Sequence, residues 1–471
     1  MRSVRPAIAG RFRGFLEDFR LLPQVALLRI SFAAALLAIS VHSVGPRANG
    51  EMLRPPAAST KSRPEPDLTG KVINRSNIHR LHVSCDFGNI LIHTTDSGDV
   101  EYRVYLKADA SEEKTKTRLL KSYRLSARSA SDGIHIKGET LNREVARLWV
   151  RLEVNLPKDY SVNAVTGGGN IEMEDLNGGA ILSTAGGNIT AGDIGAAARL
   201  ETNGGHITVK DVSGDLVAKT GGGHITTGAI AGSATLRTSG GHIHVFSVGG
   251  IGDMATRGGN VTVEHSGGQL LAETSGGRIE VGEAAGLVHA KTDGGGIHIV
   301  RVSGPSDLQT GGGNIYLTQV DSAVKASTMS GGITAWFNAP LKQSGNCELR
   351  SSDGDIVVYL PRRLPMTIDA QVQMADDHRV IVDPAFPLRL ISGDSSSGPR
   401  IIRAEGSLNG GGEILRLRAI EGNIRLVVSD TTRQVQIYNQ QMDELQQQLR
   451  QLRLQLRNLI TLQDGYDAPA H

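Results

Sequence analysis

The chain has 471 residues, of which 58 are glycine and only 4% are aromatic, and it carries 50 Lys+Arg against 48 Asp+Glu. The balanced charge excludes the basic character of a nucleic-acid-binding protein, so we expect no nucleic-acid partner. The glycines follow no Gly-X-Y period, which excludes collagen.

Residues 1–45 predict a cytoplasmic basic segment followed by a signal anchor or signal peptide. Arginines precede an apolar stretch from Ile30 to Val44, and this order keeps the basic end in the cytoplasm. We expect an N-terminal helix that spans the cell membrane once and leaves the rest of the chain extracytoplasmic, in the periplasm or at the cell surface. If the signal is cleaved, the protein is secreted; a cytoplasmic apolar helix is the remaining alternative.

Residues 46–77 are rich in proline, serine and threonine and predict a disordered linker. Residues 78–160 predict an N-terminal β-rich cap, because apolar and polar residues alternate in segments such as "GNILIHTT". Within it, "SEEKTKTRLLKSYRL" (111–125) places acidic residues before basic ones, as in a short helix.

Residues 161–340 repeat with a period of 18. An apolar residue follows a glycine turn at each step: Ile171, Ile189, Ile207, Ile225, Ile243, Val261, Ile279, Ile297, Ile315 and Ile333. A strict short period is typical of a solenoid, in which each coil buries its core only against its neighbours. The left-handed hexapeptide β-helix also has coils of this length, but the polar residues at its required apolar positions make it the weaker reading.

The second strand of each coil has its own pattern. It pairs one larger with one smaller side chain two residues apart, such as Leu216 with Ala218 and Ala234 with Leu236. This indicates a narrow core of fixed volume. A threonine follows at every coil, as at Thr220, and we expect a threonine ladder whose hydroxyls bond to each other or to turn amides.

The period slips after this block. Residues 341–430 predict C-terminal coils and a cap, residues 431–463 a coiled-coil helix, and residues 464–471 a disordered tail. The coiled coil would give self-association, although an amphipathic helix packed on the body is the alternative. Its apolar positions include Val435, Met442, Leu445, Leu449, Leu452, Leu456 and Leu459.

Together, these segments predict a mainly β fold. We expect a single-stranded parallel β-helix or solenoid with 18-residue coils, an α+β N-terminal cap, an N-terminal membrane helix and a C-terminal coiled-coil helix. The two cysteines, Cys85 and Cys347, flank opposite ends of the repeat, so we expect both to be unpaired and buried.

One segment resembles a known family. "LPKDYSVNAVTGGGNIEMEDLNGGAILSTAGGNITAGDI" (156–194) leads from a P-K-D segment into G-x-I-x repeats. With "GDIVVYLP" and "LNGGGEILRLRAIEGNIRL" later, it resembles the bacterial "putative-adhesin" family of β-solenoid domains of unknown function. The resemblance covers roughly residues 78–428. It implies the fold and brings no catalytic residues.

Two columns of the repeat are candidate metal sites. The position before the periodic isoleucine holds Asn, Gly and three successive histidines. Three stacked imidazoles are candidate ligands for a transition metal, but Asn, His and Gly also tolerate positive φ, which favours ordinary turn residues. The second column holds three aspartates, which are candidate calcium ligands, although capping of a turn is the commoner use of aspartate and we predict no metal site. The candidates are His206, His224, His242, Asp175, Asp193 and Asp211.

The sequence contains no paired carboxylates of the kind that a glycosidase uses, and no phosphate-binding loop. We therefore predict no catalytic residues, no cofactor and no enzymatic activity. An aromatic patch of Tyr316, Trp336 and Phe337 is available for ligand contact or for packing against the cap. The sequence favours a non-enzymatic, adhesin-like binding or scaffold protein of the bacterial cell envelope. A polymer-forming structural solenoid and a carbohydrate-active β-helix enzyme are the alternatives.

Overall fold

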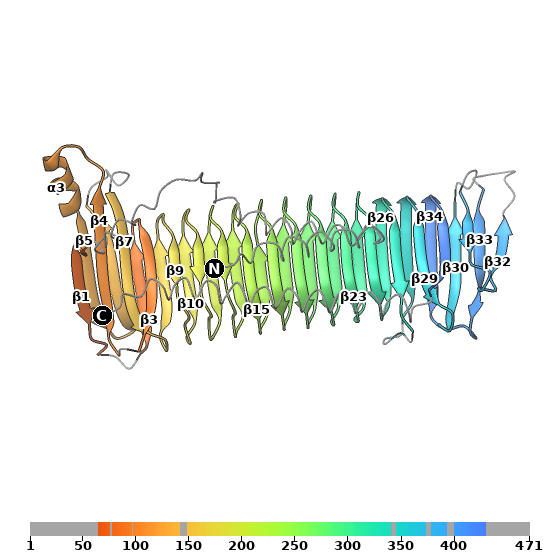
Figure 1. Cartoon of the computed structure of the whole chain (residues 1–471), viewed down its shortest axis with the longest axis horizontal. Coiled ribbons are helices and arrows are strands. Elements are labelled where there is room, and N and C mark those ends of the chain that lie inside the picture. The colour runs from red at the N-terminus through yellow and green to blue at the C-terminus, as the bar shows by residue number, and fades with distance from the viewer. Residues whose placement is uncertain are drawn as a thin grey trace, which may run out of the picture. The chain divides into compact units, whose positions relative to one another are not determined.

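The computed structural model of the chain describes residues 65–75, 78–96, 98–141, 148–339, 341, 345–373, 378–392 and 400–429. These residues form a β-solenoid whose coils follow one another along a single axis (Figure 1). The expected membrane helix and coiled-coil helix lie outside the described residues. None of the helices within the described part has the length and apolar character needed to cross a membrane.

Each coil contributes one strand to each of two facing sheets, A and B. Sheet A has 17 strands. In spatial order they are β1 (Leu68–Val72), β4 (Val100–Ala108), β7 (Leu148–Pro157), β3 (Asn89–Thr95), β9 (Ile171–Met173), β11 (Ile189–Ala191), β13 (Ile207–Val209), β15 (Ile225–Ile230), β17 (Ile243–Val248), β19 (Val261–Ser266), β21 (Ile279–Ala284), β23 (Ile297–Val302), β25 (Ile315–Val320), β27 (Ile333–Phe337), β29 (Ile356–Pro361), β35 (Ile424–Ser429) and β31 (Val380–Val382).

Sheet B runs along the opposite side of the core. In spatial order its strands are β5 (Tyr123–Ala130), β6 (Gly133–Thr140), β2 (Arg80–Cys85), β8 (Ser161–Thr166), β10 (Ala180–Thr184), β12 (Ala198–Thr202), β14 (Leu216–Thr220), β16 (Ala234–Arg237), β18 (Gly252–Thr256), β20 (Leu270–Thr274), β22 (Val288–Thr292), β24 (Ser306–Thr310), β26 (Val324–Ser330), β28 (Cys347–Asp353), β34 (Ile414–Glu421), β30 (Met366–Val372), β33 (Ile402–Leu408) and β32 (Arg389–Ser392).

The 18-residue period sets the register of both sheets. Ile207 pairs with Ile225 in sheet A, and Leu216 pairs with Ala234 in sheet B. The ten periodic Ile and Val side chains are fully buried. The paired large and small residues of sheet B are buried against them, so the solenoid predicted from the repeat is confirmed. Cys85 and Cys347 are both free and buried, as expected.

Antiparallel strands close the two ends of the described solenoid. At the N-terminal end, β4 pairs antiparallel with β7 and β1, and β5 pairs antiparallel with β6. The helix expected within 111–125 forms as α3 (Glu113–Lys121), between β4 and β5. At the C-terminal end, β33 pairs antiparallel with β30 and β32. Such elements cover edges that would otherwise template further strand pairing.

The spatial order of the coils departs from chain order at both ends. The coil formed by β2 and β3 lies between the β6–β7 coil and the β8–β9 coil. Likewise, β34 lies between β28 and β30. The periodicity does not predict this exchange, because the terminal segments lack the strict repeat. The exchange at the N-terminal end places β2 beside β6, and so brings His82 into register with His135.

Candidate metal centre and side-chain ladders

The histidine column forms a ladder of hydrogen bonds along one turn of the solenoid. The backbone N–H of His224 donates to Nδ1 of His206 at 2.9 Å, and the N–H of His242 donates to Nδ1 of His224 at 2.9 Å. The rings stack with centroids 4.9 Å apart in both pairs. An Nδ1 that accepts a hydrogen bond carries no proton, so this geometry requires the tautomer with its proton on Nε2.

In other coils, the side chain of an asparagine accepts the equivalent hydrogen bond from the backbone of the next coil. Oδ1 of Asn188 accepts from the N–H of His206 at 2.8 Å, and Oδ1 of Asn170 accepts from the N–H of Asn188 at 2.9 Å. Histidine Nδ1 and asparagine Oδ1 are therefore interchangeable acceptors here. The expected preference for positive φ is wrong: the one non-glycine residue with positive φ among those described is Asn409, in the C-terminal cap.

The aspartate column forms a second ladder. Oδ1 of Asp175 accepts from the N–H of Asp193 at 3.0 Å, and Oδ1 of Asp193 accepts from the N–H of Asp211 at 3.3 Å. The bond from Asp193 is the first cause of a lowered pKa at Asp175. The carboxylates thus cap the turn of the next coil. Metal binding by either column stays the less favoured alternative from the sequence. In the structure, Nδ1 of His206 and Oδ1 of Asp175 accept hydrogen bonds from the backbone.

The threonine ladder bonds to the turns rather than to itself. The hydroxyl of Thr220 donates to the carbonyl oxygen of Gly205 at 2.8 Å, and its oxygen accepts from the N–H of Gly223 at 3.2 Å. The same pair of bonds recurs along the repeat. The glycine is required because a Cβ on Gly223 would overlap the Gly205 carbonyl oxygen.

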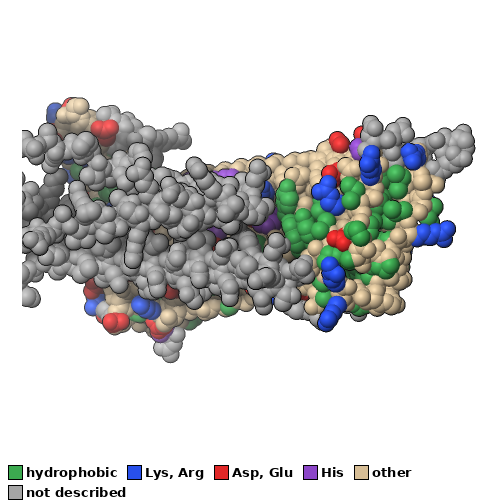
Figure 2. Space-filling model, turned by 45° about the vertical axis from the view of Figure 1, so that its right-hand side comes forward, with side chains coloured by type: hydrophobic (Ala, Val, Ile, Leu, Met, Phe, Trp, Pro, Cys, Tyr) green, Lys and Arg blue, Asp and Glu red, His purple; other side chains and the backbone are tan. Residues whose placement is uncertain are grey.

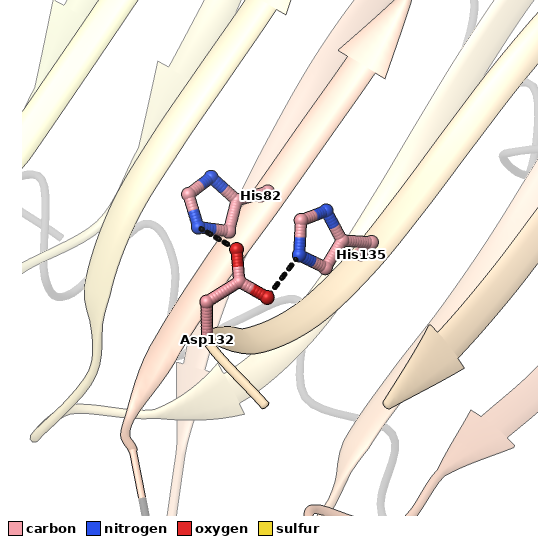
Figure 3. Close-up of side chains that lie close together, drawn as sticks. All are labelled: His82, Asp132 and His135. Atoms are coloured by element: carbon pink, nitrogen blue, oxygen red, sulfur yellow. Dashed lines mark hydrogen bonds and ion pairs between the residues drawn. The ribbon is translucent and has the colours of Figure 1, made fainter. Parts of the chain in front are cut away.

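The structure also brings together three potential metal ligands that the sequence analysis did not single out. His82 on β2 and His135 on β6 lie in register on neighbouring strands, and Asp132 lies in the β5–β6 turn. Nε2 of His135 is 2.8 Å from Oδ1 of Asp132, and Nε2 of His82 is 4.0 Å from Oδ2 (Figure 3). The two rings stack at 4.6 Å with an interplanar angle of 15°.

The three side chains differ in their hydrogen bonding and in the shifts of their pKa values. Asp132 has a lowered pKa, first because it bonds to His135. The pKa of His82 is lowered by burial and then by His135, so its imidazole is neutral near pH 7. Nε2 of His82 is buried and makes no hydrogen bond. Within the described residues, this is the one cluster of three or more His, Cys, Asp or Glu side chains with metal-binding spacing.

A groove on the outer face of sheet B leads away from His82. Its volume is about 610 Å³, and its lining includes Arg80, His82, Asn163 and Arg199. Asn163 pairs in register with His82, on the side opposite His135. Its Oδ1 is also buried without a hydrogen bond. Two orphaned polar atoms on adjacent strands are uncommon in a rigid sheet, because each carries an unmet desolvation cost.

The predicted aromatic patch divides between the core and the surface. Phe337 is fully buried, because it has the same parity as Ile333. Trp336 points outward from β27 and stacks on Tyr359 of β29, with centroids 4.7 Å apart and planes 4° apart. Tyr316 meets His298 edge-on. The outward aromatic pair is therefore Trp336 with Tyr359, a residue that the sequence analysis did not include.

The described chain is thus a capped β-solenoid with two long, mostly parallel sheets. Its sequence matches the family model described as "Toastrack DUF4097" over residues 80–382. The chain belongs to this family of β-solenoid domains of unknown function, which confirms the resemblance drawn from the sequence.

A search of curated proteins finds no match. Among solved structures, the chain is similar to one described as a "putative cell adhesion protein" from Clostridium sporogenes, at 8% identity, covering 78% of this chain and all of that chain. The TM-score is 0.14, too low for the likeness to bear on fold or function.

Proposed function

We propose that the chain is a non-enzymatic, adhesin-like binding protein of the bacterial cell envelope, and that it binds through the outward face of sheet A at its C-terminal coils. The observation that carries the proposal is the stacked Trp336–Tyr359 pair. Its two rings lie on adjacent strands and are partly exposed. Rigid aromatic side chains provide large contact area at low entropic cost, and such patches mark binding sites.

The aromatic pair continues into an apolar strip. Val427 of β35 lies in register with Tyr359, and Val357 lies beside it on β29. Figure 2 shows hydrophobic side chains, with Lys and Arg among them, gathered over the C-terminal coils. The coils hold this strip rigidly, so a ligand can bind without ordering a loop.

The cell-envelope setting rests on the sequence. The basic-then-apolar order of residues 1–45 supports a membrane anchor with the solenoid outside the cytoplasm. The heptads between Val435 and Leu459 support self-association, which would multiply weak binding through avidity. The antiparallel caps favour a discrete protein over an end-to-end polymer.

The test is binding of the full chain, purified in detergent, to envelope polysaccharides and to a glycan array. We expect Trp336→Ala and Tyr359→Ala to lower affinity at least ten-fold, or about 1.4 kcal/mol. Phe246→Ala is the matched control, because Phe246 is an outward aromatic residue of β17, far from the strip, and is 43% exposed. Absence of binding, or equal loss in all three variants, would contradict the proposal.

A further inference from the structure

We infer that His82, Asp132 and His135 bind one divalent transition-metal ion on the outer face of sheet B. This site is independent of the aromatic strip and of the proposed envelope function. Two imidazoles and one carboxylate are a common ligand set for Zn²⁺, Cu²⁺ and related ions. The three ligand atoms already lie within 4.8 Å of one another.

The ligand atoms lie near the spacing that one metal ion requires, and side-chain movement must bring them to it. Ligand atoms around a tetrahedral Zn²⁺ lie about 3.3 Å apart. The His135–Asp132 pair, at 2.8 Å, is slightly closer than this, and the His82–Asp132 pair, at 4.0 Å, is slightly wider. Both rings turn one nitrogen toward the same carboxylate (Figure 3). Asp132 lies in an exposed turn, so its side chain is free to rotate toward either histidine. The two histidine nitrogens lie within 4.8 Å of each other, and binding one ion also requires the stacked rings to tilt together.

The backbone around the site fixes the two imidazoles. β2 and β6 pair in parallel from Leu81 with Ile134 to Cys85 with Gly138, so the histidines are held in register near the start of both strands. Leu81 and Ile134 beside them are fully buried and anchor both strands in the core. Sites on sheet strands hold their ligands more accurately than sites on loops.

The orphaned Nε2 of His82 is the second, independent observation. A buried nitrogen with no hydrogen-bond partner lowers stability unless something binds it. A metal ion would satisfy this atom and would take the place of the hydrogen bond between His135 and Asp132. The groove beside His82 leaves space for water or a further ligand at the remaining coordination position.

A matched pair elsewhere in sheet B provides the control. His289 of β22 faces Asp307 of β24, with Nδ1 and Oδ2 3.7 Å apart, on the same outward face. It is a His–Asp pair without a second histidine. If one imidazole and one carboxylate were enough, His289 would bind metal as well.

The experiment is calorimetric titration of Zn²⁺ into the full chain after treatment with a chelator. We expect one site that is lost, or weakened at least about ten-fold, in His82→Ala and His135→Ala and is retained in His289→Ala. With Cu²⁺, electron paramagnetic resonance should show two coordinating imidazole nitrogens in the wild type and one in His82→Ala. Unchanged binding in both ligand variants, or no binding by the wild type, would overturn the inference.

A second variant separates binding from folding. His82→Leu removes the orphaned nitrogen but keeps an apolar body, so the metal-free variant should melt at or above the temperature of the metal-free wild type. Zn²⁺ should raise the melting temperature of the wild type and leave that of His82→Leu unchanged. An equal Zn²⁺-induced rise in both proteins would contradict the site.

Discussion

Nδ1 of His206 accepts a hydrogen bond from the backbone N–H of His224, the equivalent residue of the next coil. The bond exists only while the imidazole of His206 is unprotonated at Nδ1. A stack of histidines in a repeat is thus a set of turn caps, in which each side chain satisfies the backbone of its neighbour. We therefore expect this turn of the solenoid to be sensitive to acid.

The first prediction concerns pH. The pKa of His224 is lowered by burial, and then by His242 and His206. A His whose folded-state pKa lies below the unfolded-state value contributes its stability fully above about pH 6.5 and loses it as the pH falls through the folded-state pKa. We expect the melting temperature to fall as the pH is lowered from 7.5 to 5.5.

The matched variant replaces all three histidines of the ladder with asparagine. His206→Asn, His224→Asn and His242→Asn keep an acceptor that does not titrate in this range, as Asn188 shows in the wild type. Thermal melts followed by circular dichroism should show a smaller acid-induced loss in the triple variant. Identical pH profiles for the two proteins would contradict the ladder.

The threonine ladder predicts the effect of one lost hydroxyl. Thr220→Val keeps the side-chain shape but removes both the bond to the Gly205 carbonyl and the bond from the Gly223 N–H. We expect a loss of roughly 1–3 kcal/mol, measured by urea unfolding. Thr226→Val, on the exposed face of β15, should change stability by no more than about 0.5 kcal/mol. Similar losses in both variants would refute the role given to the hydroxyl.

Two adjacent glycines should respond differently to the same substitution. A Cβ on Gly223 would overlap the carbonyl oxygen of Gly205, whereas one on Gly222 has no neighbour closer than 3.9 Å. Gly223→Ala should therefore cost roughly 3 kcal/mol or more. Gly222→Ala should stay within about 1 kcal/mol of the wild type. The comparison uses urea unfolding of the full chain, and equal stability of the two variants would disprove the close approach of the coils.

Self-association stays a prediction from the sequence, since residues 431–463 lie outside the described residues. Replacing Leu449 and Leu456 with lysine introduces charge into the apolar seam of the heptads. Light scattering on the full chain should show a smaller particle than for the wild type. Gln446→Lys and Gln448→Lys, at flanking positions, are the control. If the mass is unchanged in the core variant, the coiled-coil prediction is wrong.

The sequence predicts the repeated part of the fold well because one physical constraint recurs at every coil. Ile207, Leu216 and Ala218 occupy a core of constant width, and Thr220 follows at a fixed place in the register. The alternation of side chains along a strand also predicts that Trp336 and Phe337 face opposite sides of the sheet. The predicted aromatic patch is wrong for Phe337, whose parity places it in the core.

The cluster of His82, Asp132 and His135 could not be predicted from the sequence, for a different reason. His82 and His135 each lie between apolar residues of a strand, which predicts that both face outward. Their proximity depends on the exchanged order of the first coils, which no repeat specifies. The sequence does not reveal the role of His206, because Asn and His both tolerate positive φ and both accept hydrogen bonds. The backbone angles distinguish these two explanations of the column.

The central claim is that the solenoid is displayed outside the cytoplasm, where it can meet an envelope ligand. The most direct measurement is the activity of a phosphatase that folds only in an oxidising compartment, fused to the C-terminus of the full chain and expressed in bacteria. The account predicts an active phosphatase that becomes inactive when residues 1–45 are deleted. An inactive phosphatase on the full chain, with the same fusion protein intact in the cytoplasm, would contradict it.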